Sequence, residues 1–240
     1  MIDWKVLDTG VATAEQNMAR DAELLVQLAN SSLPILHLYD WDGPSATYGH
    51  FIQPEKVLSK KGIQKHQLNL AKRPTGGGVL FHTCDFAFSV LVPASHPGYS
   101  LNTLENYVFV NHRVAKAIHR FLGIVPNLLS ENPKSSHEKI KHFCMAKPTV
   151  YDVMLEGRKV GGAAQRKTKH GFLHQGSVSL TIPNRELLED VLEDESIVQA
   201  MQEQSFLLLG ADAGDKELEK ARQALRQLLI EEVTQNSSSL

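Results

Sequence analysis

The chain has 240 residues, 42% of them hydrophobic and 22% charged, which is usual for a globular protein with a buried core. Its net charge of -2 argues against a general nucleic-acid binder, and its two cysteines are too few for a disulfide framework. No apolar run reaches the roughly 18 residues that span a bilayer, and the polar start lacks the apolar core of a signal peptide. We therefore expect a cytoplasmic protein that binds neither nucleic acid nor membrane.

The first half of the chain mixes helical and strand patterns. Apolar residues recur at helical spacing over 12–30 and over 104–122, where Gly123 is a typical helix stop. Alternating or continuous apolar runs bounded by turn residues predict strands between these helices. The expected strands are 33–39, 46–51, 68–74 and two within 79–92, separated by His82–Asp85, and a short helix is expected over 57–61.

The second half begins with a polar segment, 129–142, which we expect to be an exposed loop. Strands are predicted over 150–155 and 178–182, and helices over 187–193 and 216–233. Because strands and helices do not alternate strictly, the predicted fold is α+β, with mixed, largely antiparallel sheets flanked by helices. No repeat or linker divides the chain, so we expect a single domain over 1–240 without an accessory C-terminal domain.

Three consecutive glycines follow Arg73-Pro-Thr75 between two predicted strands. Glycines allow a backbone to approach a ligand closely and to direct N–H groups at it. A tight hairpin turn explains the same residues equally well. The segment is neither a phosphate-binding P-loop nor a dinucleotide fingerprint, because both of those spacings are absent.

Cys144 precedes Lys159 by fifteen residues. A thiolate is a good acyl acceptor, and a neighbouring ammonium lowers the pKa of a thiol. By spacing alone, Cys144 is more often a small buried residue, and Lys159 more often part of a solvated hairpin turn. His137, His142 and Cys144 match no common zinc spacing, so we expect no metal site.

Three motifs together resemble the biotin/lipoate protein ligase (BPL/LPL) superfamily, in its lipoate-ligase and octanoyltransferase branch. Lys72-Arg-Pro-Thr-Gly-Gly-Gly-Val-Leu-Phe-His82 is similar to R-R-x-[ST]-G-G-x-A-V-x-H. Gly157-Arg-Lys-Val-Gly-Gly-Ala-Ala-Gln-Arg166 is similar to G-[RK]-K-[IV]-x-G-S-A-x-R, and Gly171–Ser177 is similar to Q-H-G-S. The resemblance covers about residues 12–182. It implies a twisted sheet flanked by helices, with an acyl-chain tunnel under the glycine loop.

Within this branch, the segment Cys144-Met-Ala-Lys-Pro-Thr-Val-Tyr-Asp152 is similar to the C-F-x-x-P-S-x-Y-E of cysteine-dependent transferases. The resemblance implies that Cys144 takes an octanoyl or lipoyl group and passes it to a protein lysine. It implies that Lys159 stabilises the thiolate and the developing oxyanion, and moves protons. The residues it implies for substrate binding are Arg73, Thr75, Gly76, Gly77, Gly78, His82, Gly161, Gly162, Ala163 and His174.

The implied partners are lipoyl domains of 2-oxoacid dehydrogenase E2 subunits, the glycine-cleavage H protein and acyl carrier protein. The octanoyl or lipoyl group is then a substrate, and no cofactor is required. One alternative is an ATP-dependent lipoate-protein ligase, in which Lys159 would contact an acyl-adenylate and ATP and Mg would be needed. The other alternative is a non-catalytic member that only binds lipoyl domains or acyl chains.

Overall fold

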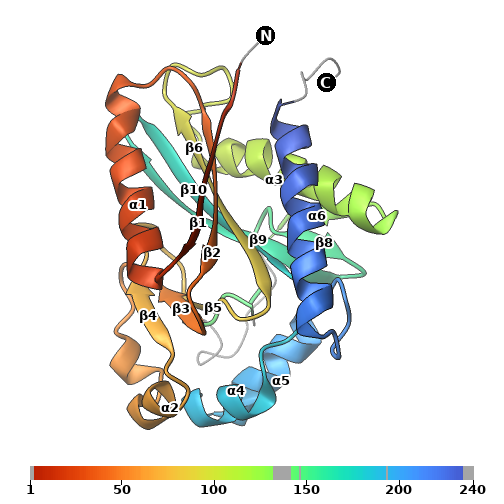
Figure 1. Cartoon of the computed structure of the whole chain (residues 1–240). Coiled ribbons are helices and arrows are strands. Elements are labelled where there is room, and N and C mark those ends of the chain that lie inside the picture. The colour runs from red at the N-terminus through yellow and green to blue at the C-terminus, as the bar shows by residue number, and fades with distance from the viewer. Residues whose placement is uncertain (1–2, 132–141, 146, 193, 235–240) are drawn as a thin grey trace.

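The structure is a computed structural model that describes residues 3–131, 142–145, 147–192 and 194–234. Within these ranges the strands form a seven-stranded sheet, ordered β1-β2-β6-β10-β9-β8-β7, and a three-stranded sheet, ordered β4-β3-β5 (Figure 1). The strands of the large sheet are β1 (Lys5–Ala12), β2 (Ile35–Trp41), β6 (Asp85–Pro93), β7 (Asn127–Leu128), β8 (Val153–Leu155), β9 (Arg158–Thr168) and β10 (Gly171–Ser179). Those of the small sheet are β3 (Ser45–Tyr48), β4 (Asn69–Lys72) and β5 (Val79–Phe81).

Most neighbouring strands are antiparallel, and the parallel pairs are β1 with β2 and β3 with β4. The helices are α1 (Ala14–Gln27), α2 (Lys60–Lys65), α3 (Thr103–Leu122), α4 (Arg185–Val191), α5 (Glu195–Gln204) and α6 (Asp215–Thr234), with 3₁₀ turns η1 (Leu28–Asn30) and η2 (Pro54–Lys56). The predicted α+β class with largely antiparallel sheets is therefore confirmed. No helix of the described residues is long and apolar enough to cross a membrane.

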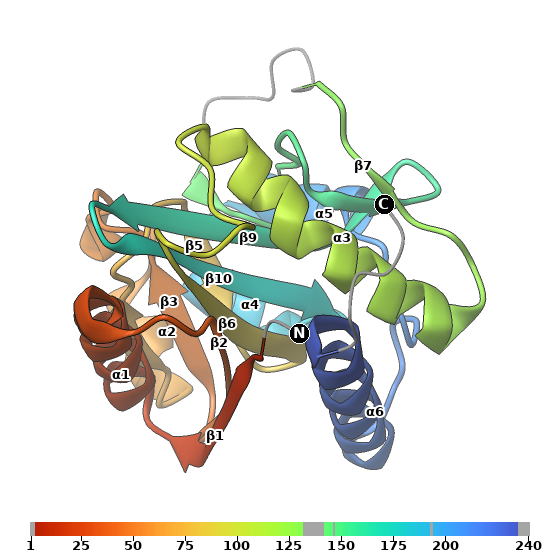
Figure 2. The same ribbon diagram turned by 90° about the horizontal axis from the view of Figure 1, so that it is seen from above.

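Helices cover both faces of the large sheet (Figures 1 and 2). On one face, α3 and α6 bury Ile118 and Leu225 against the strands, in a core that includes Phe88 and Phe172. On the other face, the apolar side of α1 packs against β2, β6 and β10. The small sheet builds a second core with α2, α4 and α5. The seam between the two sheets is where the cavity described below lies.

Several helix ends follow the expected sequence signals. Thr13 and Gln16 form a capping box at the start of α1. Gly123 ends α3 in the left-handed conformation, as its position after the apolar stripe predicted. The short helix expected over 57–61 is wrong in position, because Ser59 caps a helix that begins at Lys60. Of the loop expected over 129–142, residues 132–141 lie outside the described residues.

Two strands differ from the sequence prediction. The strand expected over 178–182 ends at Ser179 and begins much earlier, at Gly171. The segment expected as a turn around Lys159 is mostly strand β9. The turn itself is the pair Glu156–Gly157, both with positive φ, which fits a tight hairpin between β8 and β9. Lys159 therefore projects from a strand and not from a solvated turn.

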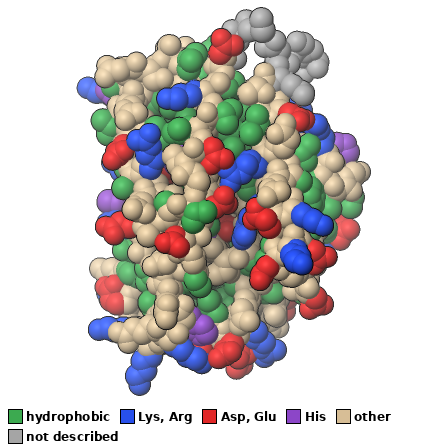
Figure 3. All heavy atoms as spheres, viewed as in Figure 1, with side chains coloured by type: hydrophobic (Ala, Val, Ile, Leu, Met, Phe, Trp, Pro, Cys, Tyr) green, Lys and Arg blue, Asp and Glu red, His purple; other side chains and the backbone are tan. Residues whose placement is uncertain are grey.

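On the face shown in Figure 3, acidic and basic side chains are interspersed over α1, β1 and α6. This distribution is in keeping with the near-neutral net charge of the chain.

Candidate active site

A cavity of about 220 Å³ opens between the two sheets. Its apolar walls come from α1, β2, β5 and the segment after residue 142, and include Met18, Tyr39, Leu80, Phe143 and Met145. Its polar walls come from the glycine loop, β9 and β10. A narrow, largely apolar cavity with a few convergent polar groups is typical of a small-ligand site.

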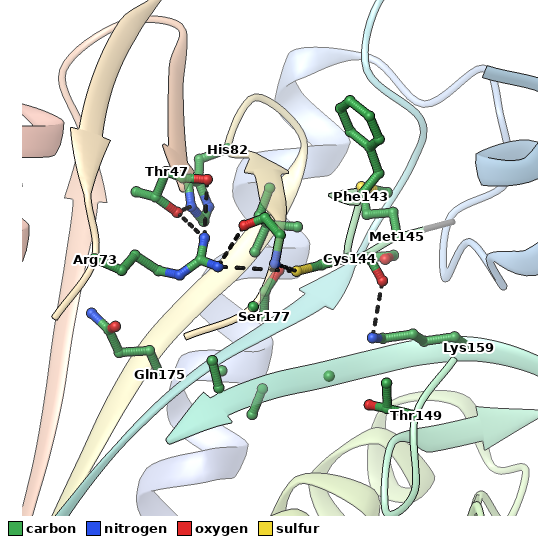
Figure 4. A pocket seen from close by; sticks show the side chains of 18 of the residues that line it. Thr47, Arg73, His82, Phe143, Cys144, Met145, Thr149, Lys159, Gln175 and Ser177 are labelled. Carbon is green, nitrogen blue, oxygen red and sulfur yellow. Dashed lines mark hydrogen bonds between the residues drawn. The ribbon is translucent and has the colours of Figure 1, made fainter. Parts of the chain in front are cut away.

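Cys144 lies at this cavity with its thiol facing the glycine loop (Figure 4). The Gly78 N–H donates to Cys144 Sγ at 3.1 Å, and Arg73 Nη2 lies 4.0 Å from the same sulfur. The Cys144 N–H donates in turn to the Val79 carbonyl, which fixes the segment against β5. The sulfur thus faces one backbone N–H and one guanidinium, the surroundings that favour a thiolate.

Only glycine fits where the loop meets Cys144. A Cβ on Gly78 would lie 2.1 Å from the His142 carbonyl oxygen, and Gly77 has a φ of +89°. At both positions a side chain would force the loop away from the cysteine segment. The glycine run is therefore a close approach of two backbones and not merely a hairpin turn.

Lys159 reaches the cavity from the opposite side, on β9 (Figure 4). Its Nζ donates to the Cys144 carbonyl at 3.1 Å and pairs with Asp152 Oδ2 at 2.8 Å. Asp152 is 2% exposed and also accepts from the backbone and hydroxyl of Thr149. The structure therefore brings Cys144 and Lys159 together, but the hydrogen bond of the ammonium is to the carbonyl and not to the sulfur.

Gly162 makes room for this lysine. A Cβ there would lie 2.4 Å from Lys159 Nζ and 2.9 Å from Asp152 Oδ1. Ala163, next along β9, also lines the cavity, whereas Gly161 pairs with Val153 on β8 and does not. Thr75 is also absent from the cavity wall, and its hydroxyl donates to Gln175 Oε1 at 2.6 Å.

His82 lines the cavity and stacks on Trp41, with ring centroids 4.0 Å apart. His174 is placed elsewhere. It lies on the face of β10 towards α3, near Tyr107, and does not line the cavity. Burial lowers the pKa of His174 to about 3, so this side chain is neutral at ordinary pH.

Other polar residues of the site were not among the sequence candidates. Gln175 lines the cavity and donates to Asp21 Oδ2 at 2.6 Å, and Ser177 donates to Asp85 Oδ2 at 2.7 Å. Thr47 contacts both Arg73 and His82. Asp152 and Asp85 stand in the quoted motifs, which is a signal that could have found them, whereas Thr47 lies in an ordinary strand pattern. Among the described residues no group of three or more His, Cys, Asp or Glu is arranged to hold a metal, and His137 lies outside them.

Comparison with known proteins agrees with this arrangement. Residues 13–211 match the family model of the lipoyl protein ligase A/B catalytic domain. The chain is 30% identical to an octanoyltransferase LipM of Halalkalibacterium halodurans, over 79% of this chain and 70% of that protein. It is 27% identical to an octanoyltransferase LipM of Bacillus subtilis, over 85% of this chain and 74% of that protein.

Two solved structures share the fold. One is a lipoate-protein ligase A bound with ATP, with a TM-score of 0.71, 22% identity and coverage of 96% of this chain and 85% of that one. The other is a bipartite lipoate protein ligase of Thermoplasma acidophilum, with a TM-score of 0.68, 21% identity and coverage of 97% and 84%. The resemblance seen in the motifs is thereby confirmed, and the chain belongs to the lipoyl protein ligase A/B catalytic-domain family.

Proposed function

We propose that this protein transfers an octanoyl or lipoyl group from a carrier thioester to a lysine of a lipoyl protein, through an acyl group held on Cys144. The observation that carries this proposal is the position of the Cys144 thiol, at the cavity and against the Gly78 N–H. The relatives of highest similarity described above are octanoyltransferases, in agreement with an acyltransferase of this kind.

In the first half-reaction the Cys144 thiolate attacks the carbonyl carbon of the donor thioester. The bond from that carbon to the donor sulfur breaks, and the donor leaves as a thiolate that takes up a proton. In the second half-reaction the neutral ε-amine of the acceptor lysine attacks the acyl-cysteine. The new C–N bond forms, the C–Sγ bond breaks, and the Cys144 thiolate is regenerated as the amine loses its proton.

The residues around the thiol have separate tasks in this scheme. The apolar walls at Met18, Tyr39 and Leu80 suit an acyl chain and exclude water from it. Lys159, held by Asp152, supplies positive charge on the carbonyl side of Cys144, where an oxyanion develops and where protons must move. The glycine loop closes the cavity on the sulfur side.

A thioester donor already holds the free energy that ATP would otherwise supply, so we propose that the transfer needs no cofactor. The ligase alternative relies on Lys159 and the glycine loop but assigns no task to the Cys144 thiol. That thiol is partly buried and directed at a backbone N–H, and an adenylate mechanism does not explain this placement. We therefore favour transfer over ligation.

The proposed acceptors are the lipoyl domains of 2-oxoacid dehydrogenase E2 subunits and the glycine-cleavage H protein, and the proposed donor is acylated acyl carrier protein. A related ligase of the same fold has been solved under a title that names its E2 lipoyl domain, which supports lipoyl-protein modification in general.

The test is a transfer assay read by mass spectrometry of the acceptor domain. We expect one added octanoyl group from octanoyl carrier protein without ATP, and none from free octanoate with ATP and Mg. Pyrophosphate release that depends on free lipoate, together with no transfer from the carrier, would contradict the proposal and favour the ligase.

A further inference from the structure

A chain of hydrogen bonds runs through the cavity wall opposite Lys159 and ends at the cysteine sulfur. Asp85 Oδ2 lies 2.8 Å from His82 Nδ1, and His82 Nε2 lies 2.8 Å from Thr47 Oγ1. Arg73 Nη1 donates to the same Thr47 oxygen at 2.7 Å, and Arg73 Nη2 lies 4.0 Å from Cys144 Sγ. The four side chains from Asp85 to Arg73 are at most 5% exposed.

The chemistry of these groups assigns each proton. Asp85 Oδ2 accepts from Ser177 as well as from His82, and an ionised carboxylate only accepts, so the proton of a neutral His82 is on Nδ1. His82 Nε2 is then an acceptor, and the single proton of the Thr47 hydroxyl points to it. The Thr47 oxygen keeps its lone pairs for Arg73. Every donor in the chain therefore points away from the cysteine except that of Arg73.

Arg73 is fixed more firmly than this chain alone requires. Its Nη1 also donates to the Thr47 carbonyl, and its Nη2 donates to the carbonyls of Gly76 and Gly78. The same guanidinium thus shapes the glycine loop that directs the Gly78 N–H at the sulfur. Position and orientation of the cation are set before any substrate binds.

The two cations of the site differ in how their charge is balanced. Lys159 is paired with the buried carboxylate of Asp152 at 2.8 Å. Within the described residues, Arg73 forms no ion pair and contacts only neutral oxygens besides the sulfur. A buried cation without a counter-charge is costly, and a thiolate at Cys144 would supply that counter-charge.

We propose that Arg73, positioned by Thr47, His82 and Asp85, is the charge that keeps Cys144 ionised, and that Lys159 acts on the carbonyl side. The inference rests on the proposed function for its purpose, but its test needs no acyl donor. The other titratable groups around Cys144 are His142, Lys147, Tyr107, and the pair Lys159 and Asp152, and they are unchanged in the decisive variants except where named.

The test is the pH dependence of iodoacetamide alkylation of Cys144, from pH 5 to pH 10, in the full chain. Arg73→Met should raise the pKa of the thiol by about one to three units, so that alkylation at pH 7 slows roughly tenfold or more. Thr47→Val deletes the linking hydroxyl without changing charge or size, and should raise the pKa by less. Lys159→Met is the matched control and should move the pKa less than Arg73→Met does. A larger shift in Lys159→Met, or none in Arg73→Met, would overturn the inference.

If Arg73→Met does not fold, Thr47→Val and the imidazole nitrogens of His82 decide. In the wild-type protein, nitrogen-15 NMR should show His82 neutral, protonated on Nδ1 and bare on Nε2. A neutral His82 with its proton on Nε2, together with an unshifted thiol in Thr47→Val, would exclude the relay.

The failure of the proposed function is distinct. A wild-type protein that shows the Arg73-dependent alkylation profile but transfers no acyl group would contradict the transferase alone. An unchanged profile in Arg73→Met, with acyl transfer intact in the wild type, would contradict the relay alone.

Discussion

Cys84 and Cys144 carry the same thiol in opposite surroundings. Cys84 is 5% exposed between β5 and β6, and its thiol donates to the Thr181 carbonyl at 3.1 Å. Burial raises the pKa of this thiol to about 12. Cys144 instead accepts an N–H and faces a cation. The C-x-x-x-P-x-x-Y-D pattern was enough to choose between the two, but the identity of the group facing the sulfur could not be predicted, because it depends on how two distant segments meet.

The two thiols should therefore differ sharply in reactivity. At pH 8 the folded protein should take up one carboxamidomethyl group, on Cys144, because the Cys84 thiol stays protonated until the pH approaches its raised pKa of about 12. Unfolding in urea should expose Cys84 and admit a second group. Peptide mapping by mass spectrometry would check this, and equal labelling of both cysteines in the folded protein would be against it.

Strand β9 shows how an element positions the site. In a regular strand, residues 159 and 162 would point to opposite faces. Here the pairing with β8 shifts, since Val153 faces Gly161 while Met154 faces Lys159, and this bulge brings Lys159 and Gly162 to one side. The sequence predicted only a turn at this point, because glycine, alanine and basic residues have weak strand propensity and a bulge leaves no local signal.

Gly162→Ala should displace Lys159 from Asp152, because the new Cβ would lie 2.4 Å from Nζ. We expect acyl transfer to fall by roughly a hundredfold, with the fold retained, because the end of a lysine can move while the backbone stays. Gly161→Ala is the matched control, since its Cβ would meet the Ser177 carbonyl at an ordinary 3.4 Å and should leave activity near that of the wild type. Steady-state kinetics would check both variants, and equal activity of the two would show that the space at Gly162 is not needed.

At the scale of the whole molecule, one face of β10 lines the cavity and the other joins the core. The helices α1, α3 and α6 and the strand pair β5 and β6 lie close to where their apolar patterns predicted them. β1 and α5 were not predicted, because an edge strand with mostly exposed residues and a polar helix have weak patterns. His174 shows the same limit, because a motif position does not reveal which face of a strand a side chain takes.

Burial of His174 should make stability depend on pH. Its pKa is about 3 in the folded protein, below the ordinary value of 6.5. Between these values the unfolded chain binds a proton that the folded chain does not, so stability is complete above pH 6.5 and falls by up to about 1.4 kcal/mol per pH unit towards pH 3.

Urea unfolding of the wild type and of His174→Gln between pH 7 and pH 4.5 would measure this contribution. The variant should have a smaller slope of unfolding free energy against pH than the wild type. His112→Gln, at an exposed position of α3, is the control and should keep the wild-type slope. Equal slopes in the wild type and His174→Gln would mean that His174 is protonated in the folded state.

The most direct test of the account is the intact mass of the protein after incubation with octanoyl carrier protein and no acceptor. We predict one added octanoyl group on the wild type and on Cys84→Ala. We predict none on Cys144→Ala, with transfer to a lipoyl domain lowered by roughly a thousandfold or more. A Cys144→Ala protein that still transfers the chain at the wild-type rate would contradict the central claim.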